Sequence, residues 1–139
     1  MGTFTASADL PSIVTAPRAA RHLVKHLLEV WNSGHSVTDA QLLVTELVSN
    51  AVDHAGGEAS LSLQLTLSDG WLRISLADGS SIRPIVRELD HTSPRGRGMQ
   101  LVAAIAGRWG CEDHEGGKRV WFELGPPGQR ATRDGDPAP

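Results

Sequence analysis

The chain has 139 residues, of which 40% are hydrophobic and 21% charged, a composition typical of a globular protein and unlike that of a disordered one. This length suits a single domain whose core buries roughly two thirds of the surface that the unfolded chain exposes. The net charge of −3 gives no basic surface, which argues against direct binding of nucleic acid and against attachment to a membrane through basic residues.

Cysteine usage and the distribution of apolar residues indicate the compartment. Cys111 is the single cysteine, so no internal disulfide can form. The first residues lack the basic and apolar regions of a secretion signal, and no later apolar run reaches the length of a membrane span. We therefore expect a cytoplasmic protein with no membrane partner.

The first two elements differ in how clearly the sequence marks them. The stretch from Thr3 to Leu10 is consistent either with an edge strand or with a frayed terminus. From Pro17 to Trp31, apolar residues recur at the spacing of an amphipathic helix. Two histidines lie one turn apart on this helix, a spacing that can bind a metal, but their basic neighbours favour a solvated face. They are His22 and His26.

A central helix is predicted to follow the capping residues 36–39 and to end at Ala55. Its apolar residues form one broad face. They are Leu43, Val44, Leu47, Val48, Ala51, Val52 and Ala55. Glu46, Asn50 and His54 follow one another at single-turn spacing along the margin of this face, where side chains are partly buried. A carboxylate and a carboxamide there need partners, which either a structural hydrogen-bond network or a binding site would supply.

A hairpin is predicted after the central helix. Leucines alternate with polar residues at positions 61, 63, 65 and 67, a period of two that indicates a strand with one buried face. Asp69-Gly70 is a two-residue turn of the kind that favours a tight hairpin. The alternation continues through Leu72, Ile74 and Leu76, and the hairpin ends at Asp78-Gly79.

The remaining elements are shorter. Residues 80–98 contain prolines, arginines and few apolar residues, which favours a loop. A short helix is predicted from Gly98 to Gly107, followed by strands near Arg108 to His114 and Lys118 to Leu124. Residues 126–139 hold no apolar side chain larger than alanine or proline, so we expect a domain at 1–125 and a disordered tail at 126–139. The four tryptophans, Trp31, Trp71, Trp109 and Trp121, are expected to be core or interface anchors.

This order of elements predicts an α+β two-layer sandwich, in which helices cover one face of a mostly antiparallel sheet. Three groups in it could carry chemistry. Gly96-Arg97-Gly98 immediately precedes a helix, where free backbone N–H groups attract phosphate, although such a glycine is commonly only a turn. Asn50 could ligate a Mg²⁺ carried by phosphates, and Glu46 could orient or deprotonate a hydroxyl. Asp78 could accept a hydrogen bond from an exocyclic amine such as that of adenine, or could be a turn aspartate.

In chain order, the pattern Glu46-x-x-x-Asn50-Ala51-x-x-His54, then Asp78-Gly79, then Gly96-Arg97-Gly98-Met99, resembles the GHKL superfamily, which includes gyrase, histidine kinases and MutL. Lys118-Arg119-Val120-Trp121 completes the resemblance, which spans residues 15–124. Within the superfamily, the match is closest to the small anti-sigma-factor serine/threonine kinases of bacteria. The resemblance implies a Bergerat ATP-binding fold, with ATP and Mg²⁺ as cofactors.

Several site residues are implied by this resemblance. Glu46 corresponds to the catalytic acidic residue, and Asn50 to the Mg²⁺ ligand. Asp78 corresponds to the aspartate that reads the adenine amino group. The other implied ATP-binding residues are Asp53 and His54 beside the helix row, Gly79 in the first glycine box, and Gly96, Arg97, Gly98 and Met99 in the second. Lys118 is interpreted as structural.

The expected function is an anti-sigma factor that phosphorylates an antagonist protein on serine or threonine. Its expected partners are a sigma factor, an anti-anti-sigma antagonist protein, or both, and a homodimer is consistent with the resemblance. The first glycine box departs from the superfamily pattern DxGxG, because the stretch that begins Asp78-Gly79-Ser80-Ser81 lacks glycine at the third and fifth positions. A nucleotide-sensing binding module that regulates a partner without chemistry is therefore the alternative.

Overall fold

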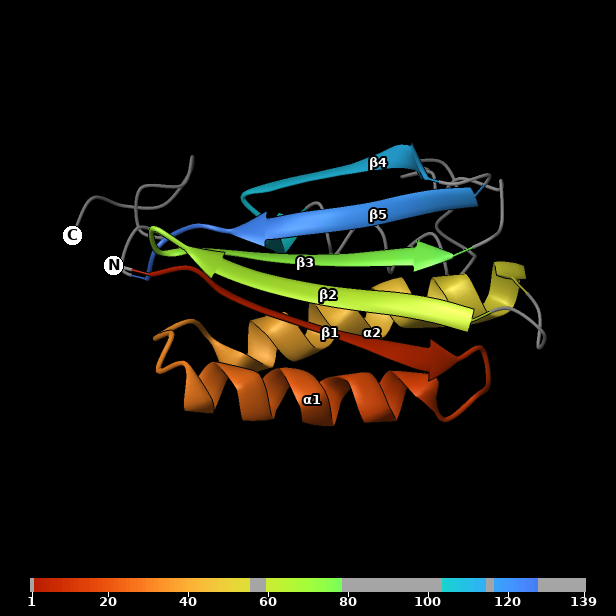
Figure 1. The fold of residues 1–139 in the computed structure, drawn as a ribbon, viewed down its shortest axis with the longest axis horizontal. Coiled ribbons are helices and arrows are strands. Elements are labelled where there is room, and N and C mark those ends of the chain that lie inside the picture. The colour runs from red at the N-terminus through yellow and green to blue at the C-terminus, as the bar shows by residue number, and fades with distance from the viewer. Residues whose placement is uncertain (1, 56–59, 79–103, 115–116, 128–139) are drawn as a thin grey trace.

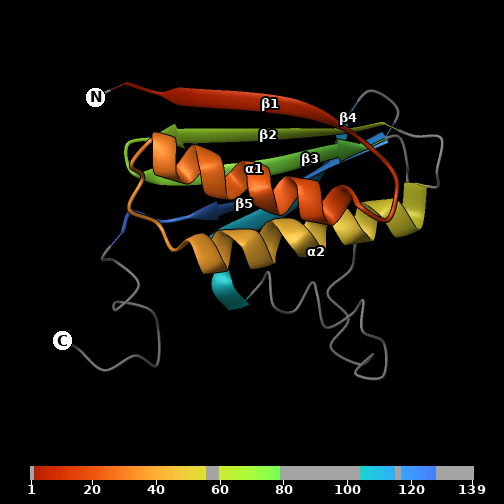
Figure 2. The same ribbon diagram turned by 90° about the horizontal axis from the view of Figure 1, so that it is seen from below.

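A computed structural model describes residues 2–55, 60–78, 104–114 and 117–127. Its elements in chain order are β1 (Phe4–Pro11), α1 (Ala16–Val30), α2 (Val37–Ala55), β2 (Ser60–Ser68), β3 (Trp71–Asp78), β4 (Arg108–His114) and β5 (Gly117–Leu124). Both helices lie on the same side of the sheet (Figures 1 and 2). No helix among these residues is long and apolar enough to cross a membrane.

The described strands form one antiparallel sheet in the order β1-β2-β3-β5-β4. The α+β two-layer sandwich predicted from the sequence is therefore confirmed. The last strand in sequence, β5, lies between β3 and β4, so β3 is the central strand and pairs with strands on both sides. This order places the start of β5 beside the end of β3.

The β2–β3 hairpin forms as its turn residues predict. Ser68 pairs with Trp71 across Asp69 and Gly70, which have φ angles of 52° and 83°. Positive φ at both central residues is the geometry of a type I′ turn, whose twist matches that of the flanking strands. The alternating leucines of β2 thereby face the same side as Leu72, Ile74 and Leu76 of β3, and all of them except the half-buried Leu67 are buried.

The N-terminal stretch is an edge strand, which decides between the two predicted alternatives. Strand β1 pairs antiparallel with β2 from Phe4 opposite Leu67 to Pro11 opposite Ser60. At the outer end of the strand, the ring of Phe4 stacks on Trp31 with 5.7 Å between centroids. This contact joins the edge strand to the residue that follows α1.

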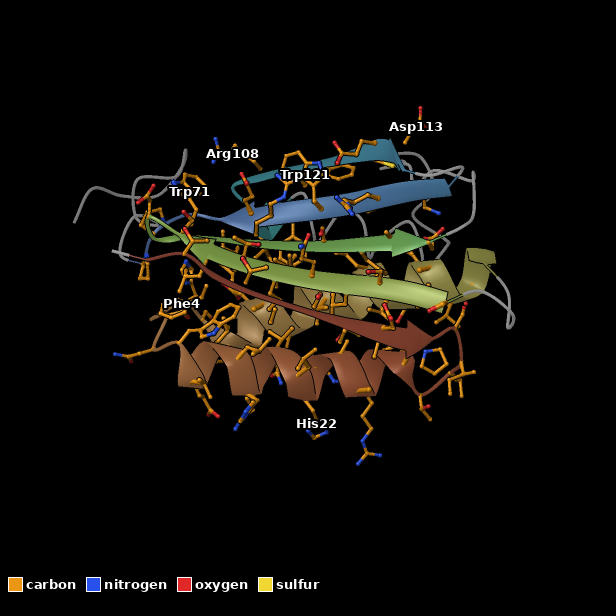
Figure 3. All side chains as sticks on the ribbon, viewed as in Figure 1. Phe4, His22, Trp71, Arg108, Asp113 and Trp121 are labelled. Carbon is orange, nitrogen blue, oxygen red and sulfur yellow. The ribbon has the colours of Figure 1, made fainter. Side chains whose placement is uncertain are left out.

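The two helices pack on each other as well as on the sheet. Gln41 donates from Nε2 to the carbonyl oxygen of Arg21 at 3.1 Å, and the Arg21 guanidinium donates to Thr45 Oγ1 at 3.3 Å. The start of α2 is capped by Ser36, whose Oγ accepts from the backbone N–H of Asp39 at 3.1 Å. His22 and His26 are exposed on α1, as the solvated-face interpretation predicts, and His22 points away from the sheet in Figure 3.

The core lies between the helices and the sheet. The helices contribute Ala16, Ala20, Val24, Leu28, Ala40, Leu43, Val44, Leu47, Val48 and Ala51, and the sheet contributes Leu61, Leu63, Leu65, Leu72, Ile74, Leu76, Val120, Phe122 and Leu124. The predicted broad apolar face of the central helix is thus the face that packs into the core. Burial of this one face fixes which side of each strand points toward the helices.

The opposite face of the sheet carries arginines over two tryptophans. The guanidinium of Arg108 lies 4.0 Å from the Trp71 ring centroid, and that of Arg73 lies 4.3 Å from the Trp121 ring centroid (Figure 3). Glu123 forms ion pairs with both arginines, at 2.8 Å and 3.3 Å. Trp71 and Trp121 are therefore half-buried on the helix-free face, so of the two predicted positions, core or interface, they do not occupy the core.

His35 lies in the loop between α1 and α2 and contacts the residue that follows β5. Its Nε2 donates to the carbonyl oxygen of Gly125 at 3.0 Å, which places the proton of the neutral ring on Nε2. Its Nδ1 is buried and has no hydrogen-bond partner among the described residues. Burial lowers the pKa of His35 from its ordinary value of 6.5 and outweighs the backbone hydrogen bonds, which raise it.

The described chain continues past β5 to Pro127. Pro126 lies against Gly70, and Pro127 lies against Gly34, where an added Cβ would meet a proline ring carbon at about 3.1 and 3.2 Å. Residues 128–139 of the predicted tail lie outside the described residues.

Candidate functional site

The row predicted on the central helix is present on α2. Glu46 is half-buried, Asn50 is buried and Asp53 is exposed. Because 3.6 residues make a turn, Glu46 and Asn50 are neighbours on the helix surface, about 6 Å apart along its axis. His54 belongs to α2, and its side chain lies outside the described part of the structure.

Asp78 is the last residue of β3 and is buried together with Lys118. The Lys118 Nζ atom lies 3.3 Å from Asp78 Oδ1, and the two side chains are 4% and 1% exposed. The pair forms because Asp78 and Lys118 are directly opposite in the β3–β5 register. Residues directly opposite in an antiparallel pair point to the same face, so the two charges meet at the end of the sheet.

Asp78 lies on the helix side of the sheet. Side chains alternate along a strand, and Asp78 shares the parity of Leu72, Ile74 and Leu76, which face the helices. Strand β3 ends at the same end of the sandwich as the C-terminal half of α2, which carries Asn50 (Figures 1 and 2). The fold therefore brings the predicted metal ligand and the predicted base-reading carboxylate to one end of the molecule.

Comparison with known proteins identifies the fold family. Residues 10–124 match the histidine kinase-like ATPase domain. The chain belongs to this family. Its predicted membership of the GHKL superfamily is thereby confirmed, and ATP is the ligand that an ATPase domain of this family implies.

Solved structures agree with this ATPase-domain fold. The RsbU and RsbW domains of Rv1364c from Mycobacterium tuberculosis match with a TM-score of 0.64 and 18% identity, over 87% of this chain and 32% of that one. The histidine kinase domain of a blue-light activated histidine kinase from Erythrobacter litoralis EL346 matches with a TM-score of 0.55 and 17% identity, over 88% of this chain and 64% of that one. The catalytic domain of histidine kinase ThkA matches with a TM-score of 0.54 and 18% identity, over 90% and 99%.

At these identities, the likenesses show the fold alone. The chain spans about one third of the length of the Rv1364c chain. No curated protein matches the sequence.

Five of the nine predicted ATP-binding residues of this ATPase domain lie outside the described residues. They are Gly79 of the first glycine box and Gly96, Arg97, Gly98 and Met99 of the second. The described site therefore consists of the α2 row and the Asp78–Lys118 pair.

The contact of Lys118 with Asp78 was not predicted from the sequence. Lys118 was interpreted as structural because it lies at a hairpin end, near the usual end of the fold. The signal that distinguishes it is the strand register, which pairs Lys118 with Asp78 across 40 positions of sequence. Local periodicity does not contain that information, since it predicts strands but not which strands are neighbours.

The chemistry of the donor set fits an ATP-bound magnesium ion. Asn50 supplies a carboxamide oxygen on a rigid helix, and Mg²⁺ bound to phosphates keeps several waters and needs few protein ligands. Among the described residues, no cluster of three or more His, Cys, Asp or Glu could hold a metal ion. Asp78 presents a carboxylate, which accepts hydrogen bonds and can face an amino group of a base.

Proposed function

We propose that this ATPase domain binds ATP with Mg²⁺ and acts as an anti-sigma factor with serine/threonine kinase activity on an antagonist protein. The observation that carries the proposal is the position of Glu46 and Asn50, one turn apart on α2, at the same end of the sandwich as Asp78. Each group has a separate task in such a site.

Asp78 would recognise the base. Asp78 is a buried carboxylate at the end of a strand that pairs with β5, and a carboxylate oxygen can accept from the adenine amino group. Asn50 would contact the Mg²⁺ that accompanies the phosphates. The magnesium ion would neutralise charge on the phosphates, which is its usual contribution to phosphoryl transfer.

Glu46 would act on the attacking hydroxyl. The serine oxygen of the partner protein forms a bond to the γ-phosphorus while the bond from that phosphorus to the β–γ bridging oxygen breaks. ADP leaves with the electron pair of the broken bond, and the hydroxyl proton passes to the Glu46 carboxylate. Positioning and charge stabilisation supply most of the rate in such reactions, so Glu46 needs only to orient the hydroxyl and accept its proton.

The proposed partners are a sigma factor, an anti-anti-sigma antagonist protein, or both, and no nucleic acid. Support comes from the match to a chain that contains RsbU and RsbW domains, and from the net charge of −3, which disfavours direct contact with nucleic acid. A reducing cytoplasm suits the single cysteine, Cys111.

Phosphoryl transfer from labelled ATP to a candidate antagonist tests the kinase proposal. We expect Glu46→Gln to keep ATP affinity and to lower labelling by roughly 10²- to 10⁴-fold, the usual contribution of a general base. Asn50→Ala should weaken binding of ATP in the presence of Mg²⁺ and lower labelling as well. Ser49→Ala is the matched control, because it lies on α2 beside the row and should label like the wild type. Equal labelling by wild type, Glu46→Gln and Asn50→Ala would overturn the proposal.

The altered first glycine box, Asp78-Gly79-Ser80-Ser81, favours a second candidate function. In it, the domain binds nucleotide and regulates a partner without phosphoryl transfer. Calorimetric titration with ATP and ADP, combined with the labelling assay, separates the two candidates. Tight binding without labelling of any antagonist supports the binding module, whereas labelling that depends on Glu46 supports the kinase.

A further inference from the structure

We infer that Ile13 and Val14, in the loop between β1 and α1, are the apolar anchor of a docking surface for the protein substrate, an antagonist with an acidic surface around an apolar depression. The inference rests on the proposed function and adds to it the surface that brings the phosphoacceptor protein to the site.

The β1–α1 loop, residues 12–15, presents two adjacent apolar side chains to solvent. Val14 is 87% exposed and Ile13 is 46% exposed. A single exposed apolar residue is common on protein surfaces, whereas neighbouring exposed apolar side chains can form the apolar centre of a contact site. The other exposed large hydrophobic residues in the described part of the chain, Phe4 and Val30, lie at the opposite ends of β1 and α1.

The backbone of the β1–α1 loop is held by hydrogen bonds. The N–H of Ile13 donates to the carbonyl oxygen of Pro11 at 2.9 Å, and the N–H of Ala16 donates to the carbonyl oxygen of Ile13 at 3.0 Å. Ser12 is buried beneath the exposed pair in sequence, with 2% of its surface exposed. A loop that is already ordered loses less conformational freedom when a partner binds, so its exposed side chains are suited to act as anchors.

The β1–α1 loop lies at the end of the sandwich that carries the candidate site (Figures 1 and 2). Asp9 of β1, Ser62 of β2 and Ala77 of β3 lie opposite one another in the sheet. Strand β1 ends two residues after this row, so the loop begins about 10 Å, or two strand spacings, to the side of the end of β3. A protein partner usually covers about 800 Å², a patch of roughly 16 Å radius. A substrate centred on the site would therefore reach the loop.

The charge beside the loop indicates what kind of partner fits. Arg18 is exposed in the first turn of α1, and Lys25 is exposed two turns further along, where it pairs with Glu29 at 3.1 Å. Helix α1 carries three basic residues and one acidic residue, although the net charge of the chain is −3. Charges at the rim of an interface steer and select partners of the opposite charge. An acidic surface around an apolar depression would complement the loop and the first turn of α1.

Steady-state labelling with the protein substrate as the variable tests the anchor. Purified anti-anti-sigma proteins of the source organism serve as substrates one at a time, with labelled ATP at saturation. For the double variant Ile13→Ser/Val14→Ser, we expect the KM of the antagonist to rise at least about tenfold, a common result of truncating interface anchors. Its kcat and its dissociation constant for ATP should not change, because the loop contributes binding and no chemistry. An unchanged KM would overturn the inference.

Three further variants make the test specific. Val30→Ser removes a side chain that is 64% exposed at the other end of α1, so its KM should equal that of the wild type. Val14→Leu keeps an apolar contact and should keep a KM near that of the wild type. Arg18→Gln should weaken the rise of KM with salt, and a salt dependence equal to that of the wild type would overturn the acidic character of the partner. If the double variant does not fold, Val14→Ser takes its place.

The possible failures can be told apart. Labelling with an unchanged KM in the double variant overturns the docking surface and leaves the proposed function standing. An antagonist that binds the wild type without being labelled, and binds the double variant at least about tenfold more weakly, overturns the kinase step and supports the docking surface. A wild type that neither labels nor binds any antagonist overturns the proposed function and, with it, the inference. A wild-type dimer that the double variant dissociates in sedimentation velocity would assign the loop to a second copy of the chain and overturn the inference.

Discussion

Replacing Gly110 with alanine should destabilise the domain, although alanine normally suits a strand better than glycine does. An alanine Cβ at this position would lie 2.8 Å from Cζ2 and 3.0 Å from Cε2 of Trp121, closer than real Cβ atoms come to a neighbour. The indole cannot easily move away, because the Arg73 guanidinium covers it at 4.3 Å and is itself paired with Glu123. The Trp121 ring therefore packs directly against Gly110 of β4.

The magnitude follows from two opposing effects. Forcing an extra methyl into occupied space typically costs 1–3 kcal/mol. Alanine has fewer unfolded conformations than glycine, and this effect alone would raise the free energy of unfolding by about 0.4–1 kcal/mol. The net expectation is a loss of about 1–2 kcal/mol in the free energy of unfolding, or a fall of roughly 3–10 °C in melting temperature.

Urea denaturation followed by circular dichroism measures this free energy. Gly107→Ala is the matched control, because its Cβ would meet the nearest atoms, Glu123 O and a Trp71 ring carbon, at 3.5 and 3.6 Å, an ordinary contact distance. We expect the control to be neutral or slightly stabilised. In a Trp121→Val background, Gly110→Ala should lose its penalty. A Gly110→Ala protein as stable as the wild type would refute the steric reasoning.

Two other predictions concern charge. Because burial lowers the pKa of His35, the unfolded chain takes up a proton first as the pH falls below 6.5, so stability should decline from there toward pH 5. His35→Gln, which can still donate to Gly125, should show a shallower decline in pH-dependent urea denaturation, and an identical slope would contradict this assignment. Asp78→Asn and Lys118→Met should each cost about 3–5 kcal/mol, because each removes one member of a buried ion pair. The double variant should cost clearly less than the sum in the same denaturation experiment, and simple additivity would contradict a coupled pair.

The elements that the sequence predicted best are those defined by neighbouring residues. Asp69-Gly70 determines the turn, and the alternating leucines determine which face of β2 is buried, so the hairpin was predicted correctly. The row of Glu46 and Asn50 also follows from helical spacing alone, and the structure places Asn50 among the buried residues as expected.

Features that depend on distant residues could not be predicted in the same way. The Asp78–Lys118 pair requires β5 to lie beside β3, and the bond from His35 to Gly125 joins residues 90 positions apart. Trp71 and Trp121 were expected to be anchors of the core or of an interface; they are not in the core, because they lie on the helix-free face under arginine side chains. The alternation of residues within a strand predicts which of its side chains face the core. Which side chains cover the other face depends on the neighbouring strands of the assembled sheet.

The central place of β3 also has a kinetic consequence. Its backbone amides are hydrogen-bonded to strands on both sides and covered by the core, whereas β1 forms an edge and packs through mostly small side chains. In native-state hydrogen exchange, β1 should open in local fluctuations, while β3 should exchange only when the whole domain unfolds. Asp78 is the last residue of β3, the strand that we expect to exchange most slowly. Its carboxylate should therefore keep its position when β1 opens locally at the edge of the sheet.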